Sequence, residues 1–379
     1  MTSFRLLKKK HKIWFFSFIG FQLIFLCGTL LINPYRLMPF SVTIVGLNDI
    51  KPKLYDHQRW IKLFDIAHIK PKTVLLGSSR ILWGLDPKHP LLNDPAYQPV
   101  YNAGILGPPI YEVERYFKHA LAMQPNIKRI ILGLDFYAFN QKFDGRTFDI
   151  EKSFGKNERE LLLLHKNLVY DLSAIFKTIR YSFKRKYVKT IRQDGRLTPA
   201  PLDAPVLYKD FFTLNKLPLF PIPPGDPKVK PKEMKSVLYD PFQLSEVDLK
   251  ALQNMINVCE ERNIELLIFM TPSFAQPGIR GTEIEVFHSL NIWEDYKTLL
   301  KKISTMHPFW SFVGPNEITS NKANFIDSSH YVFAVGDKII SKMLNVTDKT
   351  IPKKFGRYIN STNVDSYLQD LETEYIRNL

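Results

Sequence analysis

The sequence predicts an α/β protein built on a doubly wound parallel sheet, with one transmembrane helix ahead of it. Three observations carry this prediction: an uncharged apolar segment near the N-terminus, short apolar runs that alternate with helical patterns, and a basic, proline-rich stretch that interrupts the alternation. With 379 residues, of which 45% are hydrophobic, the chain can fill the core of a large domain.

The N-terminal segment predicts a membrane anchor. Residues 13–32 contain no charge, and a helix of this length spans the roughly 30 Å hydrocarbon layer of a bilayer. The tail at 1–12 carries basic and no acidic residues, which places it in the cytoplasm and the main domain outside. We expect an uncleaved signal-anchor in the plasma (inner) membrane and a periplasmic domain. A cleaved signal peptide is the alternative, but its apolar core is usually shorter and followed by small residues, whereas here the exit reads LLINPYR.

A connector at 33–70, which alternates apolar and charged residues and would lie against the membrane or the domain, leads into a main domain at 71–345. Short apolar runs in that domain are typical of parallel strands buried on both faces. Strands are predicted at 73–77, 99–102, 129–134, 264–270 and 309–313, and helices at 109–124, 157–187, 245–262, 285–303, 332–344 and 363–376, the last within a C-terminal helical tail at 346–379. Ligands of such sheets bind beyond the carboxyl ends of the strands.

The alternation stops between about 141 and 242. This stretch contains a basic helical pattern that includes Arg180, Lys184 and Arg185, followed by PLFPIPPGDPKVKPKE. We interpret it as an insertion over the active-site face, either a lid or a partner-docking element. A solvated helix with a stiff polyproline arm and no specific role is the alternative.

Composition narrows the classes of partner. The formal net charge of +15 favours acidic partners such as anionic lipid headgroups and acidic glycans. No zinc-finger, RNP-like or helix-turn-helix signature is present, so no nucleic acid partner is expected. The only cysteines are Cys27, inside the apolar segment, and Cys259, so neither a structural metal site nor an intrachain disulfide is expected, and no cofactor is predicted.

Polar residues follow the predicted strands. The run VLLGSSR puts Ser79 at a strand-to-helix turn, where a serine hydroxyl is exposed above the sheet edge and its N–H can face a developing oxyanion. Serine is also a common helix N-cap, so this turn alone does not identify a nucleophile.

Three further motifs lie at later strand ends. YNAGILGPP begins with a strand that ends at Asn102 and continues through a glycine-containing loop to Gly107. ILGLDFYAFN puts Asp135 at the end of the next strand, and FIDSSHYVFAVGD places Asp327 three residues before His330, ahead of a helix.

In this order, the four motifs resemble the sequence blocks of the SGNH (GDSL-like) hydrolase and acyltransferase superfamily. The resemblance implies a flavodoxin-like sheet with Ser79 as the nucleophile, third in the GSS turn, and with Ser78 in a structural role. It implies that His330 is the general base and acid, oriented by Asp327. It also implies that Gly107 supplies an oxyanion N–H.

One block departs from the family, which has Asn as an oxyanion donor where this chain has Asp135. An ionised carboxylate would repel an oxyanion, and loss of one such donor costs about 10²–10³ in rate. We expect Arg80 to pair with Asp135, either neutralising it or holding the nucleophile turn in shape, because their strands are neighbours in a flavodoxin-like order. Tyr137 or Asn140 would then replace the missing donor.

The GSSR and GLDF pattern is similar to membrane-anchored SGNH-like proteins of bacterial envelopes. These include teichoic acid D-alanine transfer and alginate acetylation proteins, which work beside membrane-bound O-acyltransferases. The likeness covers about 70–140 and 260–345.

Two function hypotheses follow. The first is an O-acyl esterase or O-acyltransferase that acts on an envelope polysaccharide or acylated glycan through an acyl-Ser79 intermediate. The second is a non-catalytic module that binds a glycan or docks on an integral membrane O-acyltransferase. Both have the anionic membrane surface as a partner. Aromatic residues near the predicted rim suit sugar stacking unless they belong to the core: Trp83, Tyr101, Phe136, Tyr137 and Tyr331.

Overall fold

The computed structural model describes residues 2–38, 42–143, 148–200, 238–239, 241–275, 287 and 291–376. The proline-rich part of the predicted insertion lies outside these residues. The described chain forms two compact units. Unit 1 comprises 2–61, 158–190 and 199–200, and unit 2 comprises 62–157, 191–198 and the described residues from 238 onward.

Unit 2 is organised around a six-stranded sheet with the order β2-β1-β3-β6-β7-β8. Its strands are β1 (Thr73–Leu76), β2 (Val100–Asn102), β3 (Arg129–Leu134), β6 (Glu265–Met270), β7 (Phe309–Ser311) and β8 (Arg357–Ile359). All neighbours pair in parallel except β7 and β8, which are antiparallel. Counted along the chain, the five parallel strands have the flavodoxin-like order 2-1-3-4-5. The predicted fold class is therefore confirmed, with β8 as an added edge strand.

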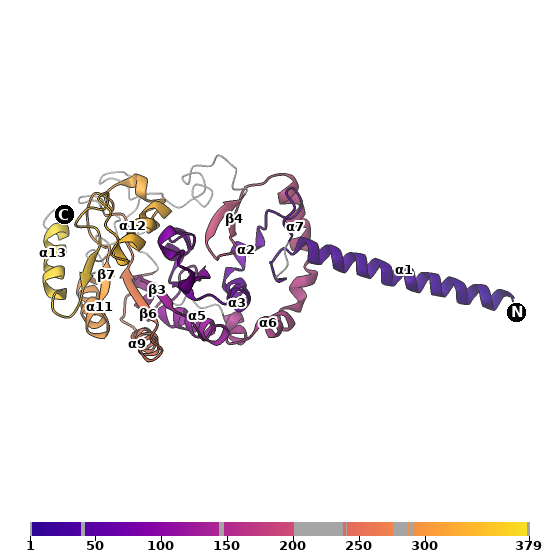
Figure 1. Ribbon diagram of the computed structural model, residues 1–379, viewed down its shortest axis with the longest axis horizontal. Coiled ribbons are helices and arrows are strands. Elements are labelled where there is room, and N and C mark those ends of the chain that lie inside the picture. Colours follow the sequence, from indigo (N-terminus) through magenta and orange to yellow (C-terminus); the bar gives the residue numbers. More distant parts are fainter. Residues whose placement is uncertain are drawn as a thin grey trace. The chain divides into compact units, whose positions relative to one another are not determined.

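Helices cover both faces of this sheet, as a doubly wound fold requires (Figure 1). The helices of unit 2 are α4 (Ser79–Gly84), α5 (Ile110–Met123), α9 (Glu246–Glu261), α11 (Trp293–Met306), α12 (Phe333–Met343) and α13 (Val364–Ile376). Single 3₁₀ turns are η1 (Pro90–Leu92), η2 (Pro95–Tyr97), η3 (Phe136–Phe139), η4 (Phe148–Ser153) and η7 (Lys322–Asn324). Helix α12 lies on one side, with α5, α9 and α11 on the other.

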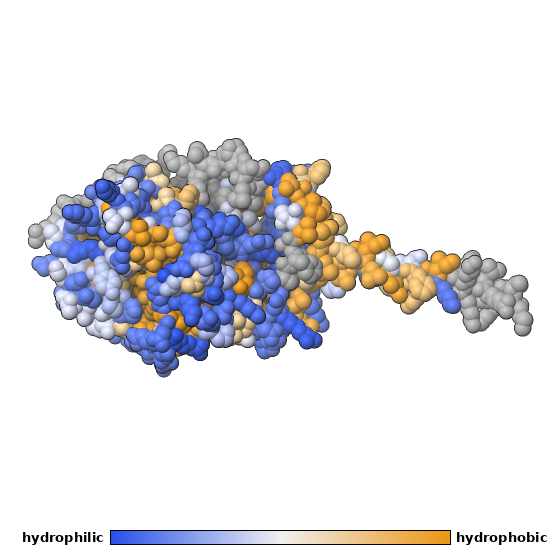
Figure 2. All heavy atoms as spheres, in the orientation of Figure 1, coloured by the Kyte–Doolittle hydropathy of each residue, from blue (hydrophilic) through white to orange (hydrophobic). Residues whose placement is uncertain are grey.

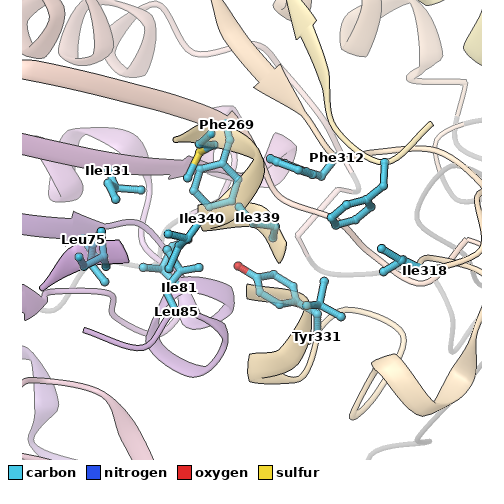
Figure 3. Packing of buried hydrophobic residues seen from close by; sticks show 14 of the residues in the cluster. Leu75, Ile81, Leu85, Ile131, Phe269, Phe312, Ile318, Tyr331, Ile339 and Ile340 are labelled. Atoms are coloured by element: carbon cyan, nitrogen blue, oxygen red, sulfur yellow. The ribbon is translucent and has the colours of Figure 1, made fainter. Parts of the chain in front are cut away.

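The core on the α12 side joins strand, α4 and α12 residues (Figure 3). Its fully buried members include Leu75, Ile131, Phe269, Ile81, Leu85, Tyr331, Ile339 and Ile340. Helices α4 and α12 contact each other, and two glycines permit this. A Cβ on Gly336 would lie 1.8 Å from the Gly84 carbonyl oxygen, and one on Gly84 would lie 2.0 Å from the Tyr331 ring. The helix that follows the GSS turn is thereby packed against the segment that follows His330.

Unit 1 contains the N-terminal helix α1 (Thr2–Ile32), α2 (Lys53–Asp56), α6 (Glu158–Leu164), η5 (Lys166–Tyr170) and α7 (Leu172–Phe183). Helix α3 (Gln58–Ile69) and the two-stranded sheet of β4 (Val188–Ile191) and β5 (Leu197–Ala200) connect the units in sequence. Residues 11–32 of α1 are apolar and long enough to cross a bilayer, and only 11% of their most apolar window is buried. This exposure excludes a core helix and leaves a signal-anchor or a signal sequence.

The structure differs from the predicted helices in two places. The predicted helix at 157–187 is two helices separated by η5, because the Asp171 carboxylate accepts from the N–H of Ala174 and starts α7 anew. The connector at 33–70 contains all of α2 and α3. The first part of the helix predicted at 285–303 falls largely outside the described residues, and its remainder is α11.

Candidate active site

The site begins at the turn between β1 and α4. Ser78 is the N-cap of α4, and its hydroxyl accepts a 3.1 Å hydrogen bond from the N–H of Arg80. Ser79 is the first residue of the helix and is partly exposed, whereas Ser78 is buried. The two serines therefore differ as expected: Ser78 caps the start of the helix, and Ser79 is accessible.

His330 lies against Ser79, although 251 positions separate them in sequence. The Nε2 atom of His330 is 2.8 Å from the Ser79 hydroxyl oxygen. On the other side of the ring, Nδ1 lies 2.8 Å and 3.0 Å from the two carboxylate oxygens of Asp327. A carboxylate at Nδ1 favours the tautomer that carries its proton there, which leaves Nε2 free to accept the serine proton. The three residues thus have the geometry of a Ser-His-Asp triad.

Asp327 shapes the loop as well as the imidazole. One of its carboxylate oxygens accepts from the backbone N–H groups of Ser329 and His330, both at 2.7 Å. Burial alone would raise the pKa of Asp327, but His330 and these two N–H groups outweigh it and hold the pKa below the usual value of an aspartate. The carboxylate therefore remains ionised beside the histidine at neutral pH.

The Arg80 guanidinium connects the nucleophile turn with two strand ends and the histidine loop. Its Nη1 lies 2.9 Å from Asp135 Oδ1 and donates at 2.9 Å to the hydroxyl of Thr271. Its Nε and Nη2 donate to the Ser329 hydroxyl at 3.1 Å and 2.9 Å. The predicted pairing of Arg80 with Asp135 is confirmed, and both side chains are buried.

Sequence reasoning did not find Thr271 and Ser329. The Thr271 hydroxyl donates to Asp135 while accepting from Arg80, so it lies between the two charges. The available signals were weak: Thr271 directly follows β6 at the edge where β3 also ends, and Ser329 precedes His330. Neither position carries a motif by itself.

The loop after β2 is built around Asn102, which is fully buried. Its amide nitrogen donates to the carbonyls of Ile81 and Leu85, and its amide oxygen accepts from the N–H of Gly104. This amide therefore holds α4 and its own loop, and both of its donor hydrogens are engaged within the protein. Asn102 thus positions the nucleophile helix and does not present its side chain as a donor to a substrate.

Gly107, the predicted oxyanion residue, lies in the same loop with φ of 51°, a left-handed value that favours glycine. The loop is anchored to the nucleophile turn, because the N–H of Ile105 donates to the Gly77 carbonyl at 3.0 Å. The role of the Gly107 N–H stays a prediction.

Of the two alternatives for the rim aromatics, sugar stacking or a place in the core, the structure supports the core. The five rings are buried, with exposed fractions no higher than 5%: Trp83, Tyr101, Phe136, Tyr137 and Tyr331. They belong to the core: Phe136 packs against Tyr239, Phe287 and Tyr296, and the Tyr331 ring packs against Gly84 of α4. Asn140 is also engaged, since its amide nitrogen donates to the carbonyls of Leu238 and Pro241. The Asn140 amide therefore does not supply the oxyanion donor that the family has at the position of Asp135.

The described residues offer general-base and nucleophile chemistry at this site. Within the ranges that the structure describes, no group of three or more His, Cys, Asp or Glu side chains is placed to hold a metal ion. The N–H of Arg80 donates to the Ser78 hydroxyl and that of Ile81 to the Ser78 carbonyl, so the N–H of Ser79 is the candidate at the start of α4 for binding an oxyanion.

Comparison with models of known protein families finds no match, and no curated protein matches the sequence.

The pairing of Arg80 with Asp135 predicts a stability effect. Asp135→Asn should leave the buried guanidinium without its counter-charge and lower the free energy of unfolding by about 1–3 kcal/mol, measured by urea denaturation in detergent. Asp370→Asn is the matched control, because Asp370 pairs with Arg357 at the surface and should cost less than about 1 kcal/mol. Equal effects of the two substitutions would contradict a stabilising role for the buried pair.

The lowered pKa of Asp327 predicts a pH dependence. Ionised Asp327 stabilises the fold at pH values above the ordinary aspartate pKa of about 3.9, and this stabilisation is lost as the pH falls through the lower folded value. The melting temperature of wild type should therefore exceed that of Asp327→Asn above about pH 5, and the difference should shrink toward about pH 2. A melting-temperature difference that stays constant over this pH range would contradict stabilisation by ionised Asp327.

Proposed function

We propose that this protein is a membrane-anchored, SGNH-like O-acyl esterase or O-acyltransferase that acts on a cell-envelope glycan. The observation that carries the proposal is the line of contacts from the Ser79 hydroxyl through His330 to Asp327, at the carboxyl edge of a flavodoxin-like sheet. Parallel α/β sheets bind their ligands at this edge. The family resemblance of the four motifs is consistent with the same chemistry.

The proposed reaction has two half-steps. His330 Nε2 takes the proton of Ser79 as its oxygen attacks an ester carbonyl, and then gives that proton to the departing alcohol. An acyl-Ser79 intermediate and a free hydroxyl compound result. In the second half-step, water or an acceptor hydroxyl attacks the acyl group while His330 repeats the two proton transfers. Water gives esterase activity, and a glycan hydroxyl gives acyl transfer.

The carboxylate at Asp135 favours the second candidate function, a non-catalytic module that binds a glycan or docks on an integral membrane acyltransferase. A carboxylate in place of an amide removes an oxyanion donor. The contacts of Asp135 weaken this objection, because its charge is matched by Arg80 and bound by Thr271. The backbone N–H of Ser79, together with the predicted N–H of Gly107, would then supply the oxyanion site.

The nucleophile is tested with paired serine variants. Ser79→Ala should abolish labelling by a fluorophosphonate and hydrolysis of a chromogenic acetyl ester, with an unchanged melting curve. Ser78→Ala, the control, should keep labelling but lose about 1 kcal/mol of stability, because it removes a helix cap. Labelling of Ser79→Ala would show that another residue is the nucleophile, and an unlabelled wild type would favour the non-catalytic module.

The proposed location is the plasma (inner) membrane, with a single span, a cytoplasmic N-terminus and an extracytoplasmic domain. It is supported by the exposed apolar length of α1 and the basic residues before it. A reporter that is active only in the cytoplasm should be silent when fused after residue 379 and active when fused ahead of residue 11. The reverse pattern would contradict this topology.

A further inference from the structure

The end of α1 is tied to the segment that follows it. The side-chain amide of Asn48 donates to the carbonyl of Leu31 at 2.7 Å, and the Lys51 ammonium donates to those of Ile32 and Asn33 at 2.7 Å and 2.8 Å. The last carbonyls of a helix have no intrahelical donor, so these bonds satisfy groups that would otherwise need water. Loop 42–51 is thereby held at the end of the apolar helix.

Both ends of α7 are hydrogen-bonded to the segment of chain that follows α1. The Tyr35 hydroxyl, three residues after α1, donates to the carboxylate of Asp171, which caps the start of α7, at 2.5 Å. At the other end of α7, the Ser182 hydroxyl accepts from the N–H of Ile50 at 3.0 Å, next to Lys51. Helices α1 and α7 are in contact. Helix α7 therefore lies alongside the exit of α1.

Helix α7 exposes large apolar side chains that a water-facing helix would bury. Thr178 and Ser182 are fully buried, whereas Phe176 and Phe183 are 66% and 78% exposed and Leu172 is 46% exposed. A helix that faces water normally buries its phenylalanines and exposes its hydroxyl groups. Here Ala174 and Ile175 share the buried face with the two hydroxyls, and the Ser182 hydroxyl is hydrogen-bonded to the backbone of Ile50, while large apolar side chains remain outside. This arrangement favours an apolar medium over α7.

Other exposed apolar side chains surround the same exit. They are Val42 and Val45 in the loop held by Asn48, Leu163 and Leu164 of α6, and Tyr170 of η5, which also contacts α1. Figure 2 shows apolar surface continuing from α1 onto the part of unit 1 that adjoins it. Exposed basic residues lie in the same elements: Lys166, Arg180 and Lys184.

We infer that these residues form a lipid-binding collar, which rests in the interfacial layer of the bilayer around the exit of α1. The inference rests on the proposed membrane span. Residues 11–32 are just long enough to cross the hydrocarbon layer, so the elements tied to Ile32 lie at its boundary. At this depth phenylalanine, leucine and valine side chains enter the acyl-chain boundary, and Lys and Arg reach anionic headgroups. The collar makes unit 1 a second membrane contact beside the span.

Spin labels on the full-length protein test the collar. In a Cys27→Ser, Cys259→Ala background, single cysteines replace Phe176, Phe183 and Val45 in the collar, Phe21 within α1, and the exposed Phe333 and Tyr358 of unit 2 as controls. The protein is reconstituted in vesicles of phosphatidylethanolamine and phosphatidylglycerol. Collision of each label with oxygen, which partitions into lipid, is compared with collision with a water-soluble nickel chelate. A melting curve of each labelled variant checks its fold.

The collar labels should prefer oxygen, as the Phe21 label does, while the two control labels prefer the nickel chelate. A lipid-embedded Phe21 label combined with collar labels that prefer nickel would overturn the collar and leave the anchor standing. A Phe21 label that itself prefers nickel would overturn the membrane span and the proposed location. Collar labels shielded from both reagents would mean that a second copy of the chain covers this surface, which would also overturn the lipid assignment.

Discussion

The ion pair between Arg80 and Asp135 is the interaction on which the geometry of the site depends. A buried guanidinium is tolerated only when counter-charge and hydrogen-bond acceptors surround it, and these come here from the ends of β3 and β6 and from the histidine loop. Because Arg80 directly follows Ser79, and Ser329 directly precedes His330, the same guanidinium fixes both sides of the contact between serine and histidine. The separation of Ser79 and His330 is thereby linked to the sheet itself.

This interaction also gives a physical reason for the carboxylate at Asp135. An amide there could donate to an oxyanion but would leave Arg80 without a counter-charge, and a buried unpaired cation is costly. With Asp135 ionised and bound by Arg80 and Thr271, its negative charge is compensated. In the proposed reaction, the backbone N–H of Ser79 and that of Gly107 would carry the larger part of oxyanion binding.

Unit 1 follows a different constraint, set by the end of the apolar helix. Asn48 and Lys51 satisfy the last carbonyls of α1 from within the unit, and several of its large apolar side chains are exposed beside basic ones. Large apolar side chains exposed to water are unfavourable, whereas at the proposed bilayer boundary they would enter the acyl-chain region and the basic ones would reach anionic headgroups. The collar and the span would then share one medium, and the collar would restrain the tilt of the anchor.

The sequence by itself determined the elements whose signals are local. Strands buried on both faces are continuous apolar runs, so β1, β2, β3, β6 and β7 could be read directly, and the strand-end motifs located Ser79, Asp327 and His330. The pairing of Arg80 with Asp135 could be predicted once β1 and β3 were assumed to be neighbours in a flavodoxin-like sheet.

Only the tertiary structure decided what depends on contacts between distant segments. The roles of Thr271 and Ser329 come from their position beside Arg80, and β8 is three residues whose pairing with β7 is non-local. The sequence left open whether the rim aromatics face a sugar or the core, because a ring at a strand end is exposed or buried according to the elements packed over it, which periodicity does not show. The outward face of α7 was hidden for the same reason: helical spacing reveals which residues share a face, and only the packed structure shows where that face points.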